Sequence, residues 1–288
     1  MSSGVTLEAS LPAKACVIGW PVAHSRSPMI HGFWLKQLKI AGSYERVAVL
    51  PEAFPAFLLS LAQQGFIGAN VTLPHKEMAF ALCEERLPAA RRLKAVNTVW
   101  IEDGKLCGDN TDAEGFLEAL DQEAPTWSEG SGSAVVIGAG GAARAIVFAL
   151  LSRGFSQIHL FNRSAERAKK LVEDFGEAIK LVDRADLPAA MSKVKILINT
   201  TSLGMKGQPP LKLDLSPLPA TALVNDIVYV PLKTQLIRDA EACGLKTVPG
   251  LGMLLHQGVP GFTRWFGKKP VVTPELRHLI EADIASTC

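Results

Sequence analysis

The sequence lacks the patterns that mark secreted, zinc-binding and membrane-spanning proteins. Its five cysteines are scattered and contain no CxxC pair, so we expect reduced thiols, with neither a disulfide framework nor a zinc site. The longest uncharged stretch, 247–263, holds four glycines, two prolines and a histidine, which is too interrupted for a membrane span. Residues 1–11 show no basic segment followed by an apolar run, so no signal peptide is predicted. These absences predict a cytoplasmic protein without a metal ion.

An excess of charge of one sign is missing as well. The chain has 30 basic and 28 acidic side chains, a formal net charge of +2, and no basic block interleaved with aromatic residues. Nucleic acid is therefore not an expected partner. A length of 288 residues, with 48% hydrophobic residues, suits two globular domains. The sequence leaves the oligomeric state open, a homodimer included.

Short apolar runs alternate with helical patterns in the first third of the chain. Ser27 is expected to cap a helix that has Pro28 in its first turn. Asp103-Gly104 is a strong turn dipeptide and predicts a hairpin. The other segments expected here are strands over 15–18, 44–50 and 67–72, a helix over 54–64, and the two hairpin strands over 95–100 and 105–108.

The remainder of the chain changes to a strand–helix–strand order. A helix beginning near Asp112 leads into 123–133, a linker rich in Ser, Gly, Glu and Pro. Strands that alternate with helices predict an α/β fold with a mostly parallel sheet covered on both faces. The strands expected here are 134–137, 157–161, 179–182, 196–199 and 223–228, and helices over 253–266 and 274–285 follow, the last one capped by Thr273.

A glycine-rich loop follows the strand at 134–137 and opens a helix. The segment from Gly138 to Ala143 matches G-x-G-x-x-A. In this pattern the first glycine permits the turn, the second lets the backbone approach a pyrophosphate, and the helix N-terminus attracts phosphate groups. The order strand, loop and helix therefore predicts a dinucleotide site.

The next strand indicates which dinucleotide binds. NAD sites usually carry Asp or Glu there to bind the ribose 2′-hydroxyl, but this chain has Asn162-Arg163-Ser164 with Arg167 one turn later. Two guanidinium groups can hold a 2′-phosphate, so the sequence favours NADP. The alternative is that both arginines are solvated charges at a helix start.

Hydride transfer between a nicotinamide and a secondary alcohol requires a group that moves the hydroxyl proton, and two residues could do so. Lys76 follows the strand segment Asn70-Val71-Thr72, and Asp112 follows Asn110-Thr111. A free lysine titrates near pH 10.4, so its surroundings would have to lower that value for efficient base catalysis. Asp112 could also orient Lys76 and the substrate, or simply cap a helix. Lys76 could instead be a surface residue or form a Schiff base.

Other polar residues could read the remaining groups of a small substrate. Thr72, Asn97 and Gln257 could bind hydroxyl groups. A carboxylate could be held by Ser25 and Ser27 beside the amides of the following helix, although helix capping explains Ser27 equally well.

Together these motifs resemble the shikimate dehydrogenases, and the resemblance runs nearly from end to end. Any one motif could be chance, but all of them in one order are specific. The segments that carry it are 24–28, 70–76, 95–98, 110–112 with Gly115, 138–143, 162–164, 199–205, 226–229 with Pro231 and Thr234, and 250–254 with Gln257.

The resemblance implies reversible, NADP-dependent interconversion of 3-dehydroshikimate and shikimate in aromatic amino-acid biosynthesis. It makes Lys76 and Asp112 the catalytic pair. The substrate contacts that it implies are Ser25, Ser27, Thr72, Asn97, Tyr229 and Gln257. The cofactor contacts that it implies are Gly138, Ala139, Gly140, Gly141, Ala142, Asn162, Arg163, Ser164, Arg167, Ile227, Gly250 and Met253, the last near the nicotinamide.

The resemblance also implies a Rossmann-like NADP-binding domain over 112–250 and a smaller α/β substrate-binding domain over 1–111. The C-terminal helices, 251–288, would complete the smaller domain, with a cleft between the two. Three alternatives stay open: a quinate/shikimate dehydrogenase, a paralogue acting on an amino-substituted analogue, and a non-catalytic NADPH-binding sensor.

Overall fold

The computed structural model describes residues 12–130 and 132–287, which form two compact units. The first unit holds the described residues up to Leu87 together with Ala95–Asp109 and Pro260–Pro270. The second holds Pro88–Lys94, Asn110–Val259 and the described residues from Val271 onward. The segment 1–11, for which no signal peptide is expected, lies outside the described residues, as does one residue of the expected linker.

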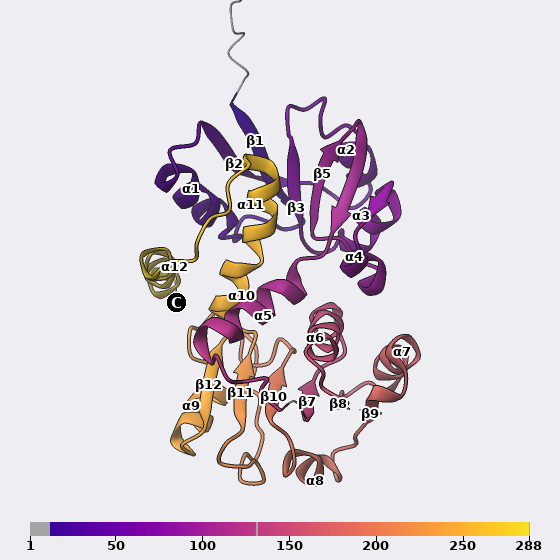
Figure 1. Ribbon diagram of the computed structural model, residues 1–288, viewed down its shortest axis with the longest axis vertical. Helices are drawn as coiled ribbons and strands as arrows, with labels where there is room; N and C mark the ends of the chain where they lie inside the picture. Colours follow the sequence, from indigo (N-terminus) through magenta and orange to yellow (C-terminus); the bar gives the residue numbers. More distant parts are fainter. Residues whose placement is uncertain (1–11, 131, 288) are drawn as a thin grey trace, which may run out of the picture. The chain divides into compact units, whose positions relative to one another are not determined.

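The first unit is built on a six-stranded mixed sheet with the order β2-β1-β3-β5-β6-β4. Figure 1 labels β1, β2, β3 and β5 of this sheet. Its first three strands in this order are parallel, while β5 runs antiparallel to β3 and forms a hairpin with β6. Asp103 and Gly104 turn the hairpin with positive φ angles of 51° and 77°, as their dipeptide predicts. The strands are β1 (Ala13–Gly19), β2 (Gly42–Ala48), β3 (Gly68–Val71), β4 (Glu85–Arg86), β5 (Thr98–Glu102) and β6 (Lys105–Asp109).

The helices of this unit pack aromatic side chains against the sheet. The rings of Trp34 and Phe262 lie 5.4 Å apart, and the indole of Trp265 donates to the carbonyl oxygen of Val99 at 2.9 Å. The C-terminal segment 260–270 is thereby fixed to the first unit. The helices are α1 (Ser27–Gln37), α2 (Phe54–Leu59), α3 (Lys76–Leu82) and most of α11 (Gly258–Phe266).

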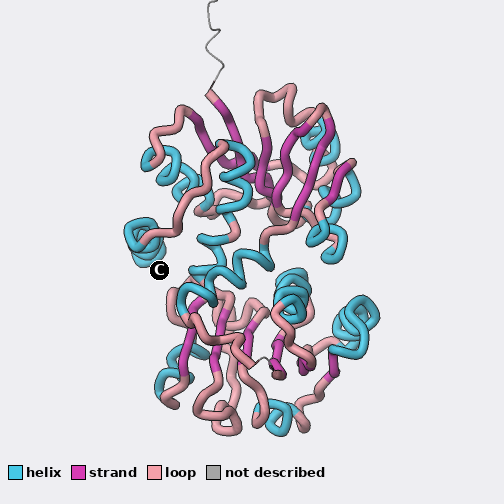
Figure 2. Tube along the Cα trace, in the orientation of Figure 1, coloured by secondary structure: helices cyan, strands magenta, loops and turns pink. Residues whose placement is uncertain are grey.

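The second unit contains a six-stranded sheet in which every pair is parallel. Numbered within this unit, the strand order is 3-2-1-4-5-6, the doubly wound order of dinucleotide-binding folds. Strands and helices alternate along most of it (Figure 2). The strands are β7 (Ser133–Ile137), β8 (Gln157–Phe161), β9 (Ile179–Leu181), β10 (Ile196–Asn199), β11 (Leu223–Asp226) and β12 (Lys246–Pro249).

Helices cover both faces of this sheet. Val136 and Ile198 pack with Ile146 of α6 in one apolar cluster, whereas their chain neighbours Val135 and Leu197 pack with Leu187 in another. This period-2 alternation confirms a parallel sheet buried on both sides. The helices are α4 (Pro88–Leu93), α5 (Asp112–Glu123), α6 (Gly141–Ser152), α7 (Ala165–Phe175), α8 (Leu187–Met191), α9 (Gln235–Ala242), α10 (Leu251–His256) and α12 (Pro274–Thr287), with a 3₁₀ turn at Gly176–Ala178.

Three local expectations were wrong. Ser27 does not cap α1, because Arg26 occupies the N-cap position and makes no side-chain capping bond. The helix expected over 54–64 ends at Leu59. The helix expected over 253–266 is two helices, α10 and α11, with Gln257 between them. The strands β4 and β12 were not expected, since each is short and lacks a long apolar run.

The compact units also differ in extent from the division expected from the sequence. Helix α10 and the C-terminal helix pack within the second unit, where Arg277 of α12 bonds Glu123 of α5 at 2.6 Å. Within the described residues, no helix is both long and apolar enough to cross a membrane.

Candidate active site

The backbone of Lys76 is fixed by the residue before it and by a neighbouring loop. Lys76 is the first residue of α3 and is half-buried. The buried ring of His75 stacks on Phe54, with the ring centroids 4.2 Å apart, and lies 2.8 Å from the carbonyl oxygen of Val49. Because a carbonyl only accepts, the His75 Nε2 donates, and burial lowers the pKa of this histidine. The amide of Val96 donates to the Lys76 carbonyl oxygen at 2.9 Å.

Ser25 lies in the loop that joins β1 to α1, and Ser27 is the first residue of α1. The Ser25 hydroxyl is 3.3 Å from the Ser27 hydroxyl and also accepts from the Ser27 amide at 3.3 Å. Arg46 donates to the Ser25 carbonyl oxygen at 2.8 Å and holds this loop against β2. The Ser27 hydroxyl in turn bonds the hydroxyl of Tyr44. Ser27 therefore belongs to a polar cluster instead of serving as a helix cap.

Thr72 and Asn97 lie where β3 and β5 meet. The antiparallel register pairs Asn70 with Thr98, so Thr72, just beyond β3, and Asn97, just before β5, lie at the same edge of the sheet. The backbone amide of Asn97 donates to the backbone carbonyl oxygen of Asp109 at 3.0 Å. The side chain of Asn97 is buried, at 3% exposure.

The first unit thus brings five of the expected residues to one edge of its sheet. Ser25 and Ser27 follow β1, and Thr72 and Lys76 follow β3, which is parallel to β1. The carboxyl ends of parallel strands are where α/β sheets place their ligands. Asn97 joins them because its strand runs the other way.

Asp112 and Gln257 are held by two helices of the second unit that pack closely. Asp112 is the first residue of α5, and its amide donates to the Asn110 side chain at 3.1 Å. The buried Thr111 hydroxyl donates to the carbonyl oxygen of Gln257 at 2.8 Å. A Cβ atom on Gly115 would lie 2.6 Å from the Cβ atom of Gln257, so α5 and α10 can approach this closely only with glycine at 115.

The glycine loop joins β7 to α6 and leaves open space at the start of that helix. Gly138 follows β7 with φ +111°, and a Cβ atom there would lie 2.5 Å from the Thr200 hydroxyl oxygen. That hydroxyl donates to Ile137 at 2.7 Å, which joins the ends of β7 and β10 where the strand order reverses. Gly140 is the N-cap residue of α6 and has no side chain that could cap the helix. The first amides of α6 can therefore bind an anion. Cβ atoms on Gly140 and Gly141 would meet nothing within 4 Å.

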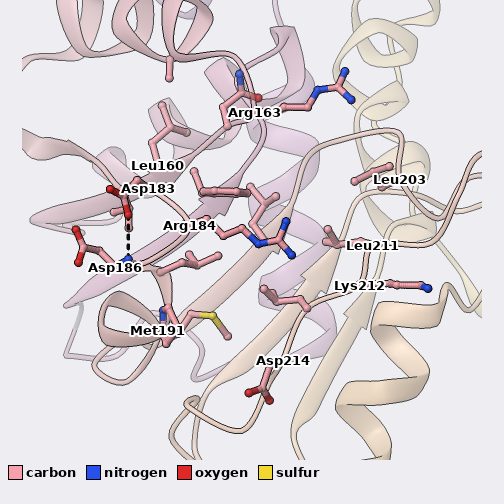
Figure 3. A pocket seen from close by; sticks show the side chains of 18 of the residues that line it. Leu160, Arg163, Asp183, Arg184, Asp186, Met191, Leu203, Leu211, Lys212 and Asp214 are labelled. Atoms are coloured by element: carbon pink, nitrogen blue, oxygen red, sulfur yellow. Dashed lines mark hydrogen bonds between the residues drawn. The ribbon is translucent and has the colours of Figure 1, made fainter.

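A cavity of about 1150 Å³ opens beside the end of β8 (Figure 3). Asn162 and Arg163 line it, and Arg184 extends into it from the loop after β9. Arg167 and Ser164 are exposed and are not among the lining residues. Apolar side chains form much of the wall, among them Leu160, Leu187, Met191, Leu203 and Leu211.

The remaining residues expected to contact the cofactor, Ile227, Gly250 and Met253, follow the ends of β11 and β12. A Cβ atom on Gly250 would lie 2.2 Å from the Ile227 carbonyl oxygen, so position 250 requires glycine. Ile227 and Met253 are both partly buried against the same apolar cluster. Tyr229, two residues beyond Ile227, is partly buried in the following loop.

Comparison with known proteins identifies the family. Residues 17–99 match the shikimate dehydrogenase substrate binding domain, 123–205 match shikimate / quinate 5-dehydrogenase, and 250–272 match the shikimate 5'-dehydrogenase C-terminal domain. Over 271 residues the chain is 61% identical to the shikimate dehydrogenase (NADP(+)) of Methylocella silvestris, covering 94% of this chain and 96% of that protein. The chain belongs to the shikimate dehydrogenase family.

Solved structures of other proteins match this family member over almost its whole length. Shikimate 5-dehydrogenase of Thermus thermophilus, solved with NADP(H) and shikimate, is 38% identical with a TM-score of 0.83, covering 94% of this chain and 99% of that one. Quinate dehydrogenase of Corynebacterium glutamicum, solved with NAD, is 28% identical with a TM-score of 0.86 and the same coverage. These matches confirm a Rossmann-type domain joined to a substrate-binding domain.

Several residues that shape this family member's site were given no role from its sequence. Asp226 is fully buried and accepts from Asn199 at 2.9 Å, Thr234 at 2.7 Å and the Val228 amide at 3.0 Å. Burial raises its pKa, and its bonds hold the turn that carries Ile227. A buried acid at a strand end was the available signal. No local sequence pattern marks Arg184 or Tyr44, because the residues that each one lies beside are distant from it in the sequence.

Proposed function

We propose that the chain catalyses the reversible, NADPH-dependent reduction of 3-dehydroshikimate to shikimate, a step of aromatic amino-acid biosynthesis. The observation that carries this proposal is the near-complete match, at 61% identity, to a relative named as an NADP(+)-dependent shikimate dehydrogenase. The site residues are compatible with it, since the chain supplies hydroxyl-binding groups, an anion-binding loop and candidate acid–base groups.

When bound, NADPH would supply the hydride that the substrate's carbonyl carbon receives. The carbonyl oxygen then gains negative charge and needs a proton, and Lys76 is the group proposed to donate it. Asp112 is proposed to bind the same hydroxyl or to exchange the proton with Lys76. Positioned acid–base groups of this kind contribute about 10²–10⁴-fold to a rate. In the direction of alcohol oxidation the same groups would take the proton.

The proposed substrate contacts divide the molecule by chemistry. Ser25 and Ser27, with hydroxyls 3.3 Å apart, would hold the substrate carboxylate. Thr72, Asn97 and Gln257 would bind ring hydroxyls, with Tyr229 as a further contact. Under this proposal a substrate-binding domain over 1–111, completed by 251–288, binds the substrate, and a domain over 112–250 binds NADP.

The proposed cofactor contacts follow the second sheet. The amides that open α6 would bind the pyrophosphate beside Gly138, Ala139, Gly140, Gly141 and Ala142. Asn162, Arg163, Ser164 and Arg167 would hold the 2′-phosphate, and Ile227, Gly250 and Met253 would contact the nicotinamide half. Both the substrate and the cofactor are water-soluble, which fits the proposed cytoplasmic location, and a homodimer is compatible with this function.

The test is a matrix of two alcohols and two cofactors with the purified protein. Shikimate and quinate are each offered with NADP⁺ and with NAD⁺, and formation of the reduced nicotinamide is followed by its absorbance. The proposal expects the highest kcat/KM for shikimate with NADP⁺. Faster oxidation of quinate with NAD⁺ would favour a quinate dehydrogenase, and NADPH binding without turnover of either alcohol would favour a sensor.

A further inference from the structure

A chain of hydrogen bonds runs behind the candidate substrate site of the first unit. The Tyr44 hydroxyl lies 2.6 Å from Asn70 Oδ1. Asn70 Nδ2 lies 3.2 Å from Thr98 Oγ1 and 3.3 Å from the Asn97 carbonyl oxygen. Thr98 Oγ1 lies 3.0 Å from Asn97 Oδ1. Asn70, Asn97 and Thr98 are at most 5% exposed, so these bonds are shielded from water.

The chemistry of the groups fixes the direction of this chain at Asn70. One end of the Asn70 amide faces the backbone carbonyl of Asn97, which only accepts, so that end must be the NH₂ group. The oxygen end therefore faces Tyr44, and the tyrosine hydroxyl must donate its proton to it. Burial raises the pKa of Tyr44 well above its ordinary value, so this donor keeps its proton.

The same reasoning fixes the amide of Asn97. Thr98 has a single hydroxyl proton and already accepts from Asn70 Nδ2. In the structure this proton is directed to Asn97 Oδ1 at 3.0 Å, and a group that receives a proton is the amide oxygen, not the NH₂ group. The two ends of an asparagine amide have nearly the same shape, and here Thr98 distinguishes them.

We propose that Thr98, supported by Tyr44 through Asn70, is a positioning residue that turns the Asn97 amide so that its NH₂ group donates to a substrate oxygen. This inference rests on the proposed function, in which Asn97 binds the substrate. An NH₂ group held in this orientation donates to a hydroxyl or carbonyl oxygen of the substrate. It disfavours a substrate group that can only donate.

The series of hydrogen bonds also joins the two halves of the proposed substrate site. Ser25 bonds Ser27, and Ser27 bonds the Tyr44 hydroxyl at which the directed chain begins. The groups proposed for the carboxylate and those proposed for the ring hydroxyls therefore share one network. A loss at Thr98 should be felt in substrate affinity and leave the affinity for NADPH unchanged.

The test compares Thr98→Val, which replaces the hydroxyl by a methyl group of similar size, with Thr98→Ser, which keeps the hydroxyl. An unmet buried hydrogen bond corresponds to roughly a tenfold to hundredfold loss. We expect Thr98→Val to raise the KM and the calorimetric Kd for shikimate by about that factor, with a smaller change in kcat. Thr98→Ser should recover most of the affinity. Thr247→Val, in β12 of the second unit, is the matched control.

Each result bears on the proposal. Wild-type affinity in Thr98→Val, or equal losses in the valine and serine variants, would overturn it, because the hydroxyl would then not be decisive. If Thr98→Val does not fold, as judged by circular dichroism, Tyr44→Phe takes its place, and an unchanged shikimate KM in that variant would overturn the proposal. A wild-type protein that binds NADPH but does not turn over shikimate would instead contradict the proposed function.

Discussion

The two units build their candidate sites from different materials. In the first unit the expected site consists of side chains, and a buried network including Tyr44, Asn70 and Thr98 orients them. In the second unit it consists largely of backbone, made accessible by Gly138 and Gly140 at the mouth of α6. A backbone site tolerates many neighbouring side chains but few changes at its glycines. A side-chain site depends on partners that are distant in sequence.

Lys76→Ala should show the largest difference between an effect on catalysis and an effect on cofactor binding. We expect kcat to fall about thousandfold, within the range for a lost acid–base group, while the Kd for NADPH stays unchanged because the second unit is intact. Steady-state kinetics and a fluorescence titration with NADPH measure the two quantities. Lys105→Ala, at an exposed lysine paired with Glu85, is the control. A Lys76→Ala enzyme with wild-type kcat would remove this lysine from the chemistry.

Gly138→Ala should produce the converse result. The added methyl group meets the Thr200 hydroxyl, and the backbone has φ +111°, which strains any residue but glycine. We expect the Kd for NADPH to rise about a hundredfold, as strain and clash of about 3 kcal/mol would produce, with unchanged shikimate affinity. Gly244→Ala, at φ +72° with open space around it, controls for backbone strain alone. Equal effects of the two variants would contradict the role of the contact with Thr200.

Acidification should destabilise the first unit through His31. Burial lowers the pKa of His31 to about 3, whereas an unfolded histidine titrates near pH 6.5. Below pH 6.5 the unfolded chain therefore binds a proton at this histidine that the folded chain does not, and His31 alone should lower the free energy of unfolding by about 1.4 kcal/mol per pH unit from pH 6 to pH 4. Urea unfolding at several pH values measures this slope.

A matched pair of variants assigns that slope to one unit. His31→Phe keeps a ring for the stack on Tyr44, whose centroid lies 4.0 Å away, and should reduce the slope by about 1.4 kcal/mol per pH unit. His256→Gln, in the second unit where burial lowers the histidine pKa to about 4, should remove less of the loss. An unchanged slope in His31→Phe would show that this histidine is not its source.

Arg163→Ala should have the smallest effect and should distinguish two cofactors that differ by one phosphate. We expect the Kd for NADPH to rise about tenfold, as for one lost charge-assisted hydrogen bond, and the Kd for NADH to stay the same. Arg238→Ala, on α9 of the same unit and bonded to Gln235, is the control. Equal losses for both cofactors would refute the role of Arg163 in binding the 2′-phosphate.

The sequence predicted the second unit better than the first. The limits of β8 and β10 agree with the predicted strands residue for residue, because buried parallel strands are apolar runs with clear ends. The loop at Gly138 was recognisable because the glycines that its backbone requires are neighbours in the sequence. The strand order and the close approach of Thr200 to Gly138 needed the structure.

In the first unit, sequence patterns identified the polar residues but not what they do for one another. Asn70 and Thr72 were noticed because they stand in the strand segment before Lys76, yet the bond from Tyr44 to Asn70 joins residues 26 positions apart. Ser27 shows the limit of local reasoning most clearly. Its hydroxyl could cap a helix, but the structure commits it to Ser25 and Tyr44.

The two glycines between α5 and α10 have a mechanical consequence. A Cβ atom on Gly115 would meet Gln257 at 2.6 Å, and one on Gly252 would meet Glu123 at 2.5 Å, so the helices interlock at both ends of their contact. Sliding or rotating one helix against the other would require these backbones to separate first. In any larger motion of the molecule, Asp112 and Gln257 should therefore move together as one rigid body, with the distance between them unchanged.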